Sequence, residues 1–320
     1  LMRYDTLTRA IWTTRLNNQP VSFALSMILL MVAAAAVGLE RIVTRRAVEP
    51  ARVSSARPTT VRLGRSMPLG LGFVVITLVL ALLAPAVALF DWASDGIARD
   101  ARGGRELLID GGDLIEATWN TTMISAVTAA VAVVAVLPIA YLVARYRSRL
   151  GRVASSIVVS TFALPGLLIA LAIFFWTLRT PWAADHLRGT LGLLVFAYVV
   201  RFGAQAMGAA EVAVDGVPRR LGEAARILGA GSLRRLRTVD LPLMLPGLLA
   251  GAGLVLLSTM KELPITLLVA PFDFPTLTTK IFLSFEDAFI AEAGLMALIL
   301  VSLSAALTWL LIVRRAEHLH

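Results

Sequence analysis

The sequence contains no cysteine, only three histidines and only two lysines, and each shortage narrows what the chain can do. Without cysteine it forms no disulfide and offers no thiol nucleophile or thiolate ligand. His186, His318 and His320 are too few for a histidine-rich metal site. Neither Lys261 nor Lys280 follows a glycine, as the lysine of a Walker A phosphate loop must. We therefore expect no catalytic residue, no metal site and no cofactor in this chain.

Charged residues are also scarce: they make up 16% of the 320 residues, whereas 58% are hydrophobic. Globular proteins average about 25% charged and about 45–50% apolar residues, so the composition predicts an all-α integral membrane protein. A spanning helix needs about 20 consecutive apolar residues, and several stretches approach or reach that length. Seven candidate spans cover residues 21–39, 68–90, 121–144, 153–178, 191–210, 241–260 and 293–313.

The distribution of charge orients these spans. If the C-terminus is cytoplasmic, the inner segments hold 20 of the 30 basic residues and the outer segments hold 14 of the 21 acidic ones. Cytoplasmic loops of membrane proteins carry such an excess of arginine and lysine. The net charge of +9 therefore indicates how the spans are oriented, with a cytoplasmic C-terminus. We expect contact with membrane lipid and none with nucleic acid, because no nucleic-acid-binding motif accompanies the charge.

An internal repeat explains the odd number of spans. Shifting the sequence by 270 residues aligns 11 identical positions between residues 6 and 46, beginning with Thr6-Leu7-Thr8 on Thr276-Leu277-Thr278. We therefore expect residues 1–46 to hold the last transmembrane helix of a preceding repeat, and the chain to begin within a longer, duplicated protein. Residues 47–66 are then a cytoplasmic linker, and residues 67–320 a complete six-helix unit. Transporters are often built from such repeats.

The long inner loop at residues 211–242 carries the most informative pattern. Leu221, Ala224, Ile227 and Leu228 predict an amphipathic helix, and Gly229 is placed to close it in a left-handed conformation. We expect this helix to project below the bilayer. The alternative is an interfacial helix that lies on anionic lipid.

This loop resembles the EAA loop of ATP-binding-cassette importer permeases of the type I fold. That pattern is E-A-A, three residues, G, nine residues, and I-x-L-P. The matching residues are Glu223, Ala224, Ala225, Gly229, Leu241 and Pro242, with Val239 in place of isoleucine.

The resemblance implies a division of labour among subunits. The helix through Glu223 would be the coupling helix that docks in a separate ATPase subunit, present in two copies, which binds ATP and magnesium. An extracytoplasmic binding protein would deliver the cargo, and a second permease repeat would complete the pathway. This chain would then be a multi-pass transporter subunit of the bacterial inner membrane and not itself an enzyme.

The stretch K-E-L-P-I-T-L-L at residues 261–268 is similar to ferric-iron permeases with two fused repeats. The resemblance implies iron as cargo. Thiamine, phosphonate and polyamine permeases are related alternatives. Two other classes remain: a secondary transporter driven by an ion gradient, which would need carboxylates inside the charge-free spans, and an accessory scaffold subunit.

Five residues are candidates for the pathway or its gate. Lys261 and Glu262 follow a charge-free span and either line an outer gate, paired with each other or across the pathway, or mark the membrane boundary. Pro165 and Gly166 interrupt the fourth span and suggest a broken helix along the pathway. Arg201 lies inside the fifth span, where we expect a structural arginine near the cytoplasmic end rather than a substrate contact.

Overall fold

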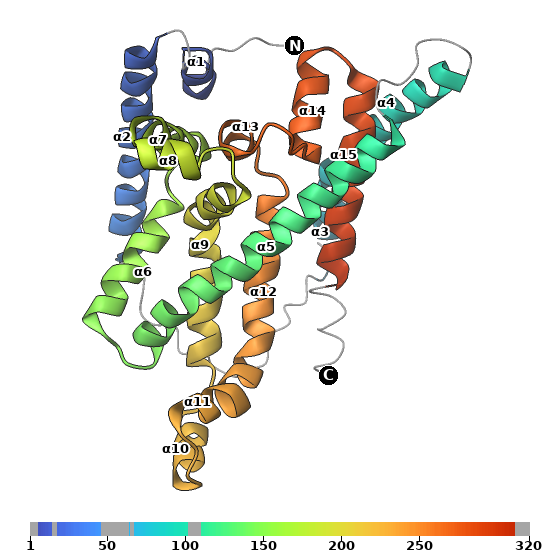
Figure 1. Ribbon diagram of the computed structural model, residues 1–320. Helices are drawn as coiled ribbons and strands as arrows, with labels where there is room; N and C mark the ends of the chain where they lie inside the picture. The colour runs from blue at the N-terminus through green and yellow to red at the C-terminus, as the bar shows by residue number, and fades with distance from the viewer. Residues whose placement is uncertain (1–5, 15–17, 46–63, 65–66, 102–109, 311–320) are drawn as a thin grey trace.

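The computed structural model describes residues 6–14, 18–45, 64, 67–101 and 110–310. The described residues form helices and no strand, which confirms the all-α prediction. Most of the predicted linker, the last ten residues and two histidines, His318 and His320, lie outside the described residues. The helices are α1 (Leu7–Thr14), α2 (Gln19–Arg45), α3 (Met67–Leu78), η2 (Val79–Leu83), α4 (Ala84–Ala101), α5 (Gly111–Ala144), α6 (Arg149–Thr161), α7 (Gly166–Arg179), α8 (Pro181–His186), α9 (Leu191–Asp215), α10 (Arg219–Ile227), α11 (Ser232–Arg235), η3 (Leu236–Asp240), α12 (Leu241–Thr259), α13 (Pro264–Val269), α14 (Leu277–Glu286) and α15 (Ile290–Thr308) (Figure 1).

Five helical segments in the described part are long and apolar enough to cross a membrane. They are Met67–Asp95, Gly111–Ala144, Leu191–Asp215, Ser232–Thr259 and Ile290–Thr308. Each contains most of one predicted span. The predicted span 153–178 is instead divided between α6 and α7, which are bent by 104° relative to each other. The first predicted span lies in α2, whose apolar part, Pro20–Ala36, is shorter than the other five.

The core forms where α5 crosses α9 and α12 (Figure 1). Small residues bring these backbones together: a Cβ built on Gly251 of α12 would lie 2.6 Å from the Cβ of Ala209 on α9. A Cβ on Gly247 would lie 2.8 Å from the Cβ of Ala213. Between membrane helices the attraction is mainly van der Waals packing, and small residues permit the close approach it needs. The glycines and alanines thus set the crossing of α9 and α12.

The segment before α15 is tied to α5. The N–H of Leu277 donates to Oγ1 of Thr121 at 2.9 Å, and Asn120 Nδ2 donates to the carbonyl oxygen of Pro275 at 3.1 Å. Thr276 caps α14 in a reciprocal box with Thr279.

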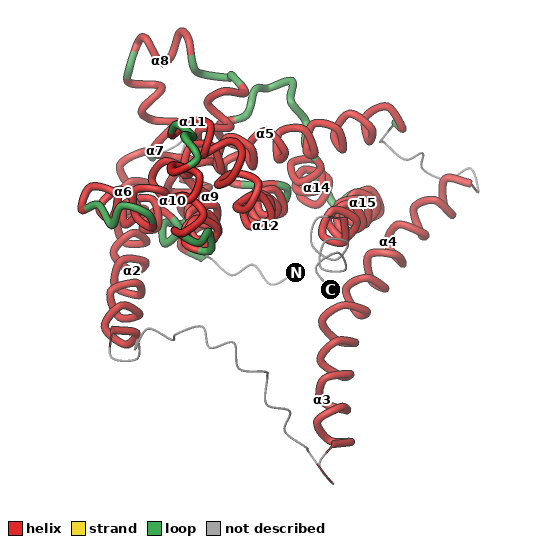
Figure 2. Tube along the Cα trace, turned by 90° about the horizontal axis from the view of Figure 1, so that it is seen from below, coloured by secondary structure: helices red, strands yellow, loops and turns green. Residues whose placement is uncertain are grey.

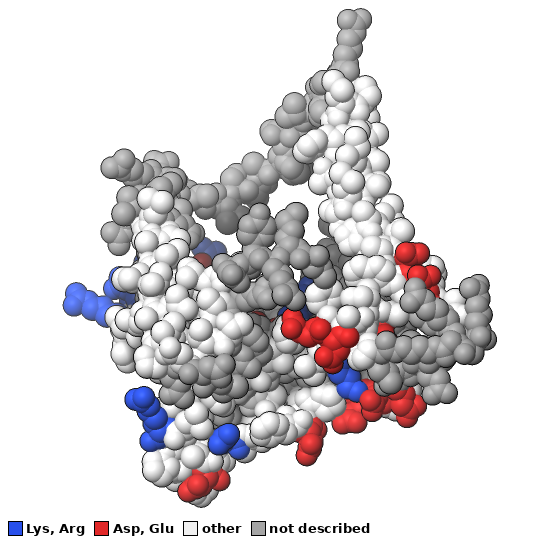
Figure 3. Space-filling model, turned by 90° about the horizontal axis from the view of Figure 1, so that it is seen from above, with Lys and Arg blue, Asp and Glu red and all other residues white. Residues whose placement is uncertain are grey.

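Viewed from the end opposite α10, charged side chains interrupt a largely uncharged surface (Figure 3).

The first two helices pack on the middle of the chain. Ile11 of α1 is fully buried against Leu167, Leu171 and Phe175 of α7. The Phe23 and Phe175 rings lie 4.7 Å apart. By contrast, α3 extends away from the bundle (Figure 2), and the apolar window of the Met67–Asp95 segment has no buried residue. That surface is left to lipid or to another protein.

Candidate functional site

The helix α10 carries the E-A-A residues at the end of the bundle where α11 also lies (Figure 1). Gly229, directly after the C-cap of this helix, has φ +80°. The N–H of Ala230 then donates to the carbonyl oxygen of Ala225 at 2.9 Å, which satisfies a terminal helix acceptor. Gly229 therefore adopts the predicted left-handed conformation and turns the chain back toward the membrane.

The E-A-A residues face in two directions. Glu223 and Ala224 are exposed, whereas Ala225 is only 8% exposed. The apolar stripe is also exposed: Ile227 retains 86% and Leu228 85% of its accessible surface. Two such side chains on a protruding helix form an apolar surface of the kind that binds another protein.

The opposite face of α10 rests on two arginines of the same chain. A Cβ built on the buried Gly222 would lie 2.9 Å from Nη2 of Arg145, so a side chain at this position would displace that guanidinium. Arg145 follows the end of α5, and its Nη1 donates to the carbonyl oxygen of Val217 at 3.0 Å. Arg235 of α11 also approaches Gly222. These contacts attach α10 to the end of α5 and to the segment that continues into α12.

Asp240 fixes Arg235 in place. The π-helical turn η3 lets Arg235 Nε donate to Oδ2 of Asp240 at 3.2 Å, and the hydroxyl of Tyr141 on α5 donates to the same oxygen. Asp240 is 1% and Arg235 is 6% exposed. No sequence pattern predicted this cluster, although Asp240, a charged residue directly before Leu241-Pro242, was a visible signal.

The last two residues of the EAA-loop pattern, Leu241 and Pro242, begin α12, which continues from α11 and η3. Leu241 packs against the core at the start of α12, whereas Pro242 is exposed. Proline lacks an N–H and disturbs the helical ladder, and here it is the second residue after the π turn η3. Helices α11, η3 and α12 therefore form one segment from Ser232 to Thr259.

Four of the five gate candidates meet at the break between α6 and α7. Arg201, from α9, uses Nη1 to donate to the carbonyl oxygens of Phe162 at 2.9 Å and Leu164 at 2.8 Å. Both acceptors lie in the turn that ends at Pro165, which precedes the first residue of α7, Gly166. The guanidinium thus binds the carbonyl oxygens that the interrupted helix leaves without helical partners.

Glu262 reaches the same place from the turn between α12 and α13. A Cβ built on Gly166 would lie 2.6 Å from Oε1 of Glu262 and 3.5 Å from Nε of Arg201. Within the described part of the chain, these two buried atoms have no hydrogen-bond partner. A carboxylate, a guanidinium and the N-terminus of α7 therefore converge around a glycine, and a side chain at this position would displace the Glu262 carboxylate.

One of the alternatives left open for Lys261 and Glu262 is not observed, and the expected place of Arg201 in its helix is wrong. Among the described residues, the side-chain ion pairs within 4 Å are Arg235–Asp240 and Lys280–Asp113, so Lys261 and Glu262 do not pair with each other. Lys261 is exposed instead. Arg201 does not lie near the end of α9 that leads to α10; it lies near the middle of that helix, where its guanidinium reaches the break between α6 and α7.

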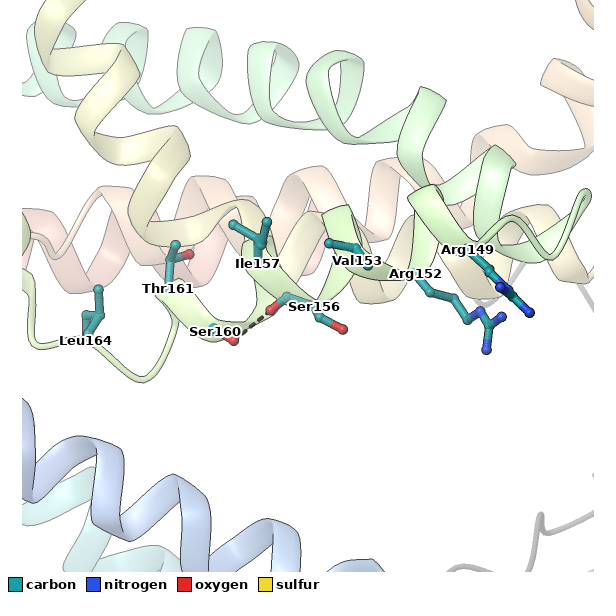
Figure 4. Close-up of a pocket in the computed structure, with 8 residues that line it drawn as sticks. All are labelled: Arg149, Arg152, Val153, Ser156, Ile157, Ser160, Thr161 and Leu164. Carbon is teal, nitrogen blue, oxygen red and sulfur yellow. Dashed lines mark hydrogen bonds between the residues drawn. The ribbon is translucent and has the colours of Figure 1, made fainter.

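A groove of about 760 Å³ runs along α6. Arg149, Arg152, Ser156 and Ser160 point to its open side (Figure 4). The Ser160 hydroxyl donates to the carbonyl oxygen of Ser156 at 2.6 Å. Polar side chains on one face of a membrane helix usually face protein or water rather than lipid.

Comparison with known proteins identifies a matching family. Residues 136–317, which include α6 to α15, match the family described as the binding-protein-dependent transport system inner membrane component. The matched region contains both the EAA loop and the break with Arg201 and Glu262.

Individual relatives cover different shares of the chain. The Fe(3+)-transport system permease protein FbpB 2 of Haemophilus influenzae is 29% identical over 240 residues, 75% of this chain and 46% of that protein. A putative 2-aminoethylphosphonate transport system permease protein, PhnV of Salmonella typhimurium, is 28% identical over 122 residues, 38% of this chain and 46% of that protein. The chain thus spans about half the length of these curated relatives.

A solved structure shares the fold. One chain of a bacterial ABC transporter involved in the import of the acidic polysaccharide alginate aligns with a TM-score of 0.54 and 20% identity. The alignment covers 80% of this chain and 99% of the transporter chain.

Proposed function

The chain belongs to the family of binding-protein-dependent transport system inner membrane components, and from that premise we propose that it forms part of the pore of an ATP-driven importer for ferric iron. It is a multi-pass membrane protein without an ATPase site of its own. In this proposal, energy comes from a separate ATPase subunit, and an extracytoplasmic binding protein delivers the cargo.

The exposed stripe on α10 carries the coupling part of the proposal. Ile227 and Leu228 stay in solvent on the protruding helix, although burying a side chain of this size is worth about 1.5–3 kcal/mol. A groove in the ATPase subunit would gain that energy by covering them. Glu223, exposed on the same helix, would add a charged contact at its rim.

Movement of α10 would reach the membrane through its two arginine contacts. Arg145 joins α10 to the end of α5, and Arg235 joins it to α12 through Asp240. When ATP draws the partner subunits together, these links would carry the displacement into the helices that form the core. The bundle would then change between its inward- and outward-facing states.

The break between α6 and α7 would serve as the gate. Arg201 holds the carbonyl oxygens of the break, while Glu262 reaches it from the α12–α13 turn, so three separate helical elements meet at one point. Relative movement of α9 and α12 would shift this contact. The polar face of α6 would line the inner, water-filled part of the pathway.

The N-terminal helices support a two-repeat arrangement. Helix α1 begins at Leu7 and α14 at Leu277, the same 270-residue offset that aligns the identical residues. In both places a short helix precedes a longer apolar one. We infer that α1 and α2 end a preceding repeat, and that the C-terminus is cytoplasmic, on the same side as α10.

The cargo assignment depends on the 29% identity to the Haemophilus influenzae Fe(3+) permease protein. The similarity to the 2-aminoethylphosphonate permease protein makes 2-aminoethylphosphonate the competing cargo. The test reconstitutes the permease with its ATPase and binding protein in proteoliposomes and measures ATP-dependent uptake. We expect uptake of ferric iron and none of 2-aminoethylphosphonate. Uptake of phosphonate alone would overturn the cargo, and uptake driven by an ion gradient without ATP would overturn the importer class.

A further inference from the structure

A small cavity lies between α10 and the helices that support it. Its volume is about 160 Å³, and it is lined by Arg145, Tyr146, Gly222, Glu223, Arg226 and Arg235. Three of these six residues are arginines from three different elements. The apolar stripe explains how α10 docks, but it gives no reason for a cavity rich in guanidinium groups beside it.

The cavity carries more positive than negative charge. Of its three arginines, Arg235 has a carboxylate within 4 Å among the described residues, namely Asp240. Arg145 donates to a backbone carbonyl, and neither Arg145 nor Arg226 has such a carboxylate partner in the described part of the chain. Among the residues that line the cavity, Glu223 is the single carboxylate beside three guanidinium groups, and Asp240, which pairs with Arg235, lies outside the lining. An added anion would therefore be attracted to the cavity.

One wall of the cavity is held in a fixed arrangement. Arg235 is 6% exposed and is bound by Asp240, which Tyr141 also contacts. Gly222 leaves room for Arg145, because any side chain would approach its Nη2 to 2.9 Å. Donors positioned in advance lose little conformational freedom when they bind a ligand.

We propose that this cavity binds a carboxylate side chain of the ATPase subunit, a contact that rests on the proposed function. Guanidinium groups bind carboxylates through paired, charge-assisted hydrogen bonds. The position favours a protein over a lipid headgroup, because the cavity is partly formed by α10, which also exposes Ile227 and Leu228. An acidic side chain beside an apolar groove on the partner would meet both features at once.

The test measures binding of the ATPase subunit to the permease in nanodiscs of neutral lipid. We expect Arg226→Gln to weaken binding at least about tenfold, since a charge-assisted hydrogen bond is lost. Arg147→Gln removes an equal charge from the exposed inner loop outside the cavity and should bind like wild type. Arg226→Glu should bind weakest, and an acid-to-lysine substitution in the partner should restore its binding.

The outcomes distinguish a failure of the carboxylate contact from a failure of the proposed function. If the wild type binds the ATPase and Arg226→Gln and Arg145→Gln bind equally well, the carboxylate contact is wrong while the proposed function stands. If the wild type does not bind the ATPase at all, both the proposed function and the carboxylate contact in the cavity are overturned. A loss that occurs only when the nanodiscs contain anionic lipid would assign the cavity to a lipid phosphate and overturn the proposal.

Discussion

Arg201, in the middle of α9, donates a hydrogen bond of 2.8 Å to the carbonyl oxygen of Leu164, in the break between α6 and α7. A second bond, of 2.9 Å, goes to the carbonyl oxygen of Phe162. A single side chain thus satisfies two backbone acceptors of an interrupted helix, at a site that Glu262 also approaches. The same contact holds the bend and joins it to the helix that leads to α10.

Replacing Arg201 should loosen the break. Arg201→Gln removes a charged donor from two carbonyl oxygens, and hydrogen bonds to charged groups contribute about 1.5–3 kcal/mol each. We expect a lower thermal unfolding temperature in detergent and strongly reduced transport. Arg179→Gln, an exposed arginine at the end of α7, is the matched control and should behave like wild type. Equal stability and transport in both variants would show that the Arg201 contact has no role.

A side chain at Gly166 should displace the Glu262 carboxylate from the break. In Gly166→Ala the new Cβ would lie 2.6 Å from Oε1 of Glu262, closer than real Cβ atoms approach an oxygen, so the carboxylate or α7 must shift. We expect reduced transport with the protein still inserted in the membrane. Gly208→Ala is the control, because a Cβ there meets nothing within 4 Å and helical alanine is favoured over glycine by about 0.5–1 kcal/mol. Transport equal to wild type in Gly166→Ala would contradict the predicted crowding.

Gly229 should be needed for its backbone conformation. At φ +80°, alanine or aspartate is strained, and the left-handed region costs a side-chain-bearing residue about 1–2 kcal/mol. Gly229→Ala and Gly229→Asp should therefore misdirect α10 and abolish the stimulation of ATP hydrolysis while leaving insertion intact. Gly231→Ala, two residues away, has neither a positive φ nor a crowded Cβ and should remain coupled. Normal transport by Gly229→Asp would refute the need for this turn.

The absence of cysteine allows a direct test of the α6 face. A cysteine reacts as its thiolate, which water stabilises and lipid does not. Ser156→Cys should therefore react with a membrane-impermeant thiol reagent at least about tenfold faster than Val159→Cys, which is exposed but outside the groove. Reaction of Ser156→Cys that is no faster than that of Val159→Cys would contradict an aqueous pathway that is confined to the groove.

Much of the fold follows from hydrophobic length and from one motif. Five predicted spans lie in membrane-length helical segments, because a run of apolar residues can satisfy its backbone in lipid only as a helix. The loop around Glu223 led to the predicted family, and the match of residues 136–317 to the binding-protein-dependent transport system inner membrane component confirms that family. Gly229 was predicted to be left-handed because a local turn required it.

The rest depends on contacts between distant segments. The 104° bend between α6 and α7 is not encoded by Pro165 alone, since proline also occurs within the continuous helices α5 and α12. Tyr141 meets Asp240 across 99 residues, and Arg201 reaches Leu164 across 37. No local pattern predicts such pairs, because they arise only once the helices have packed.

The central claim, that α10 couples this permease to an ATPase, is tested most directly by ATP hydrolysis in the reconstituted complex. Binding protein loaded with ferric iron should stimulate hydrolysis by the wild type, whereas Ile227→Asp places a charge on the exposed apolar stripe and should abolish the stimulation. Membrane insertion should be unchanged in this variant, because Ile227 is 86% exposed in the isolated chain. Full stimulation of the Ile227→Asp complex would contradict the account.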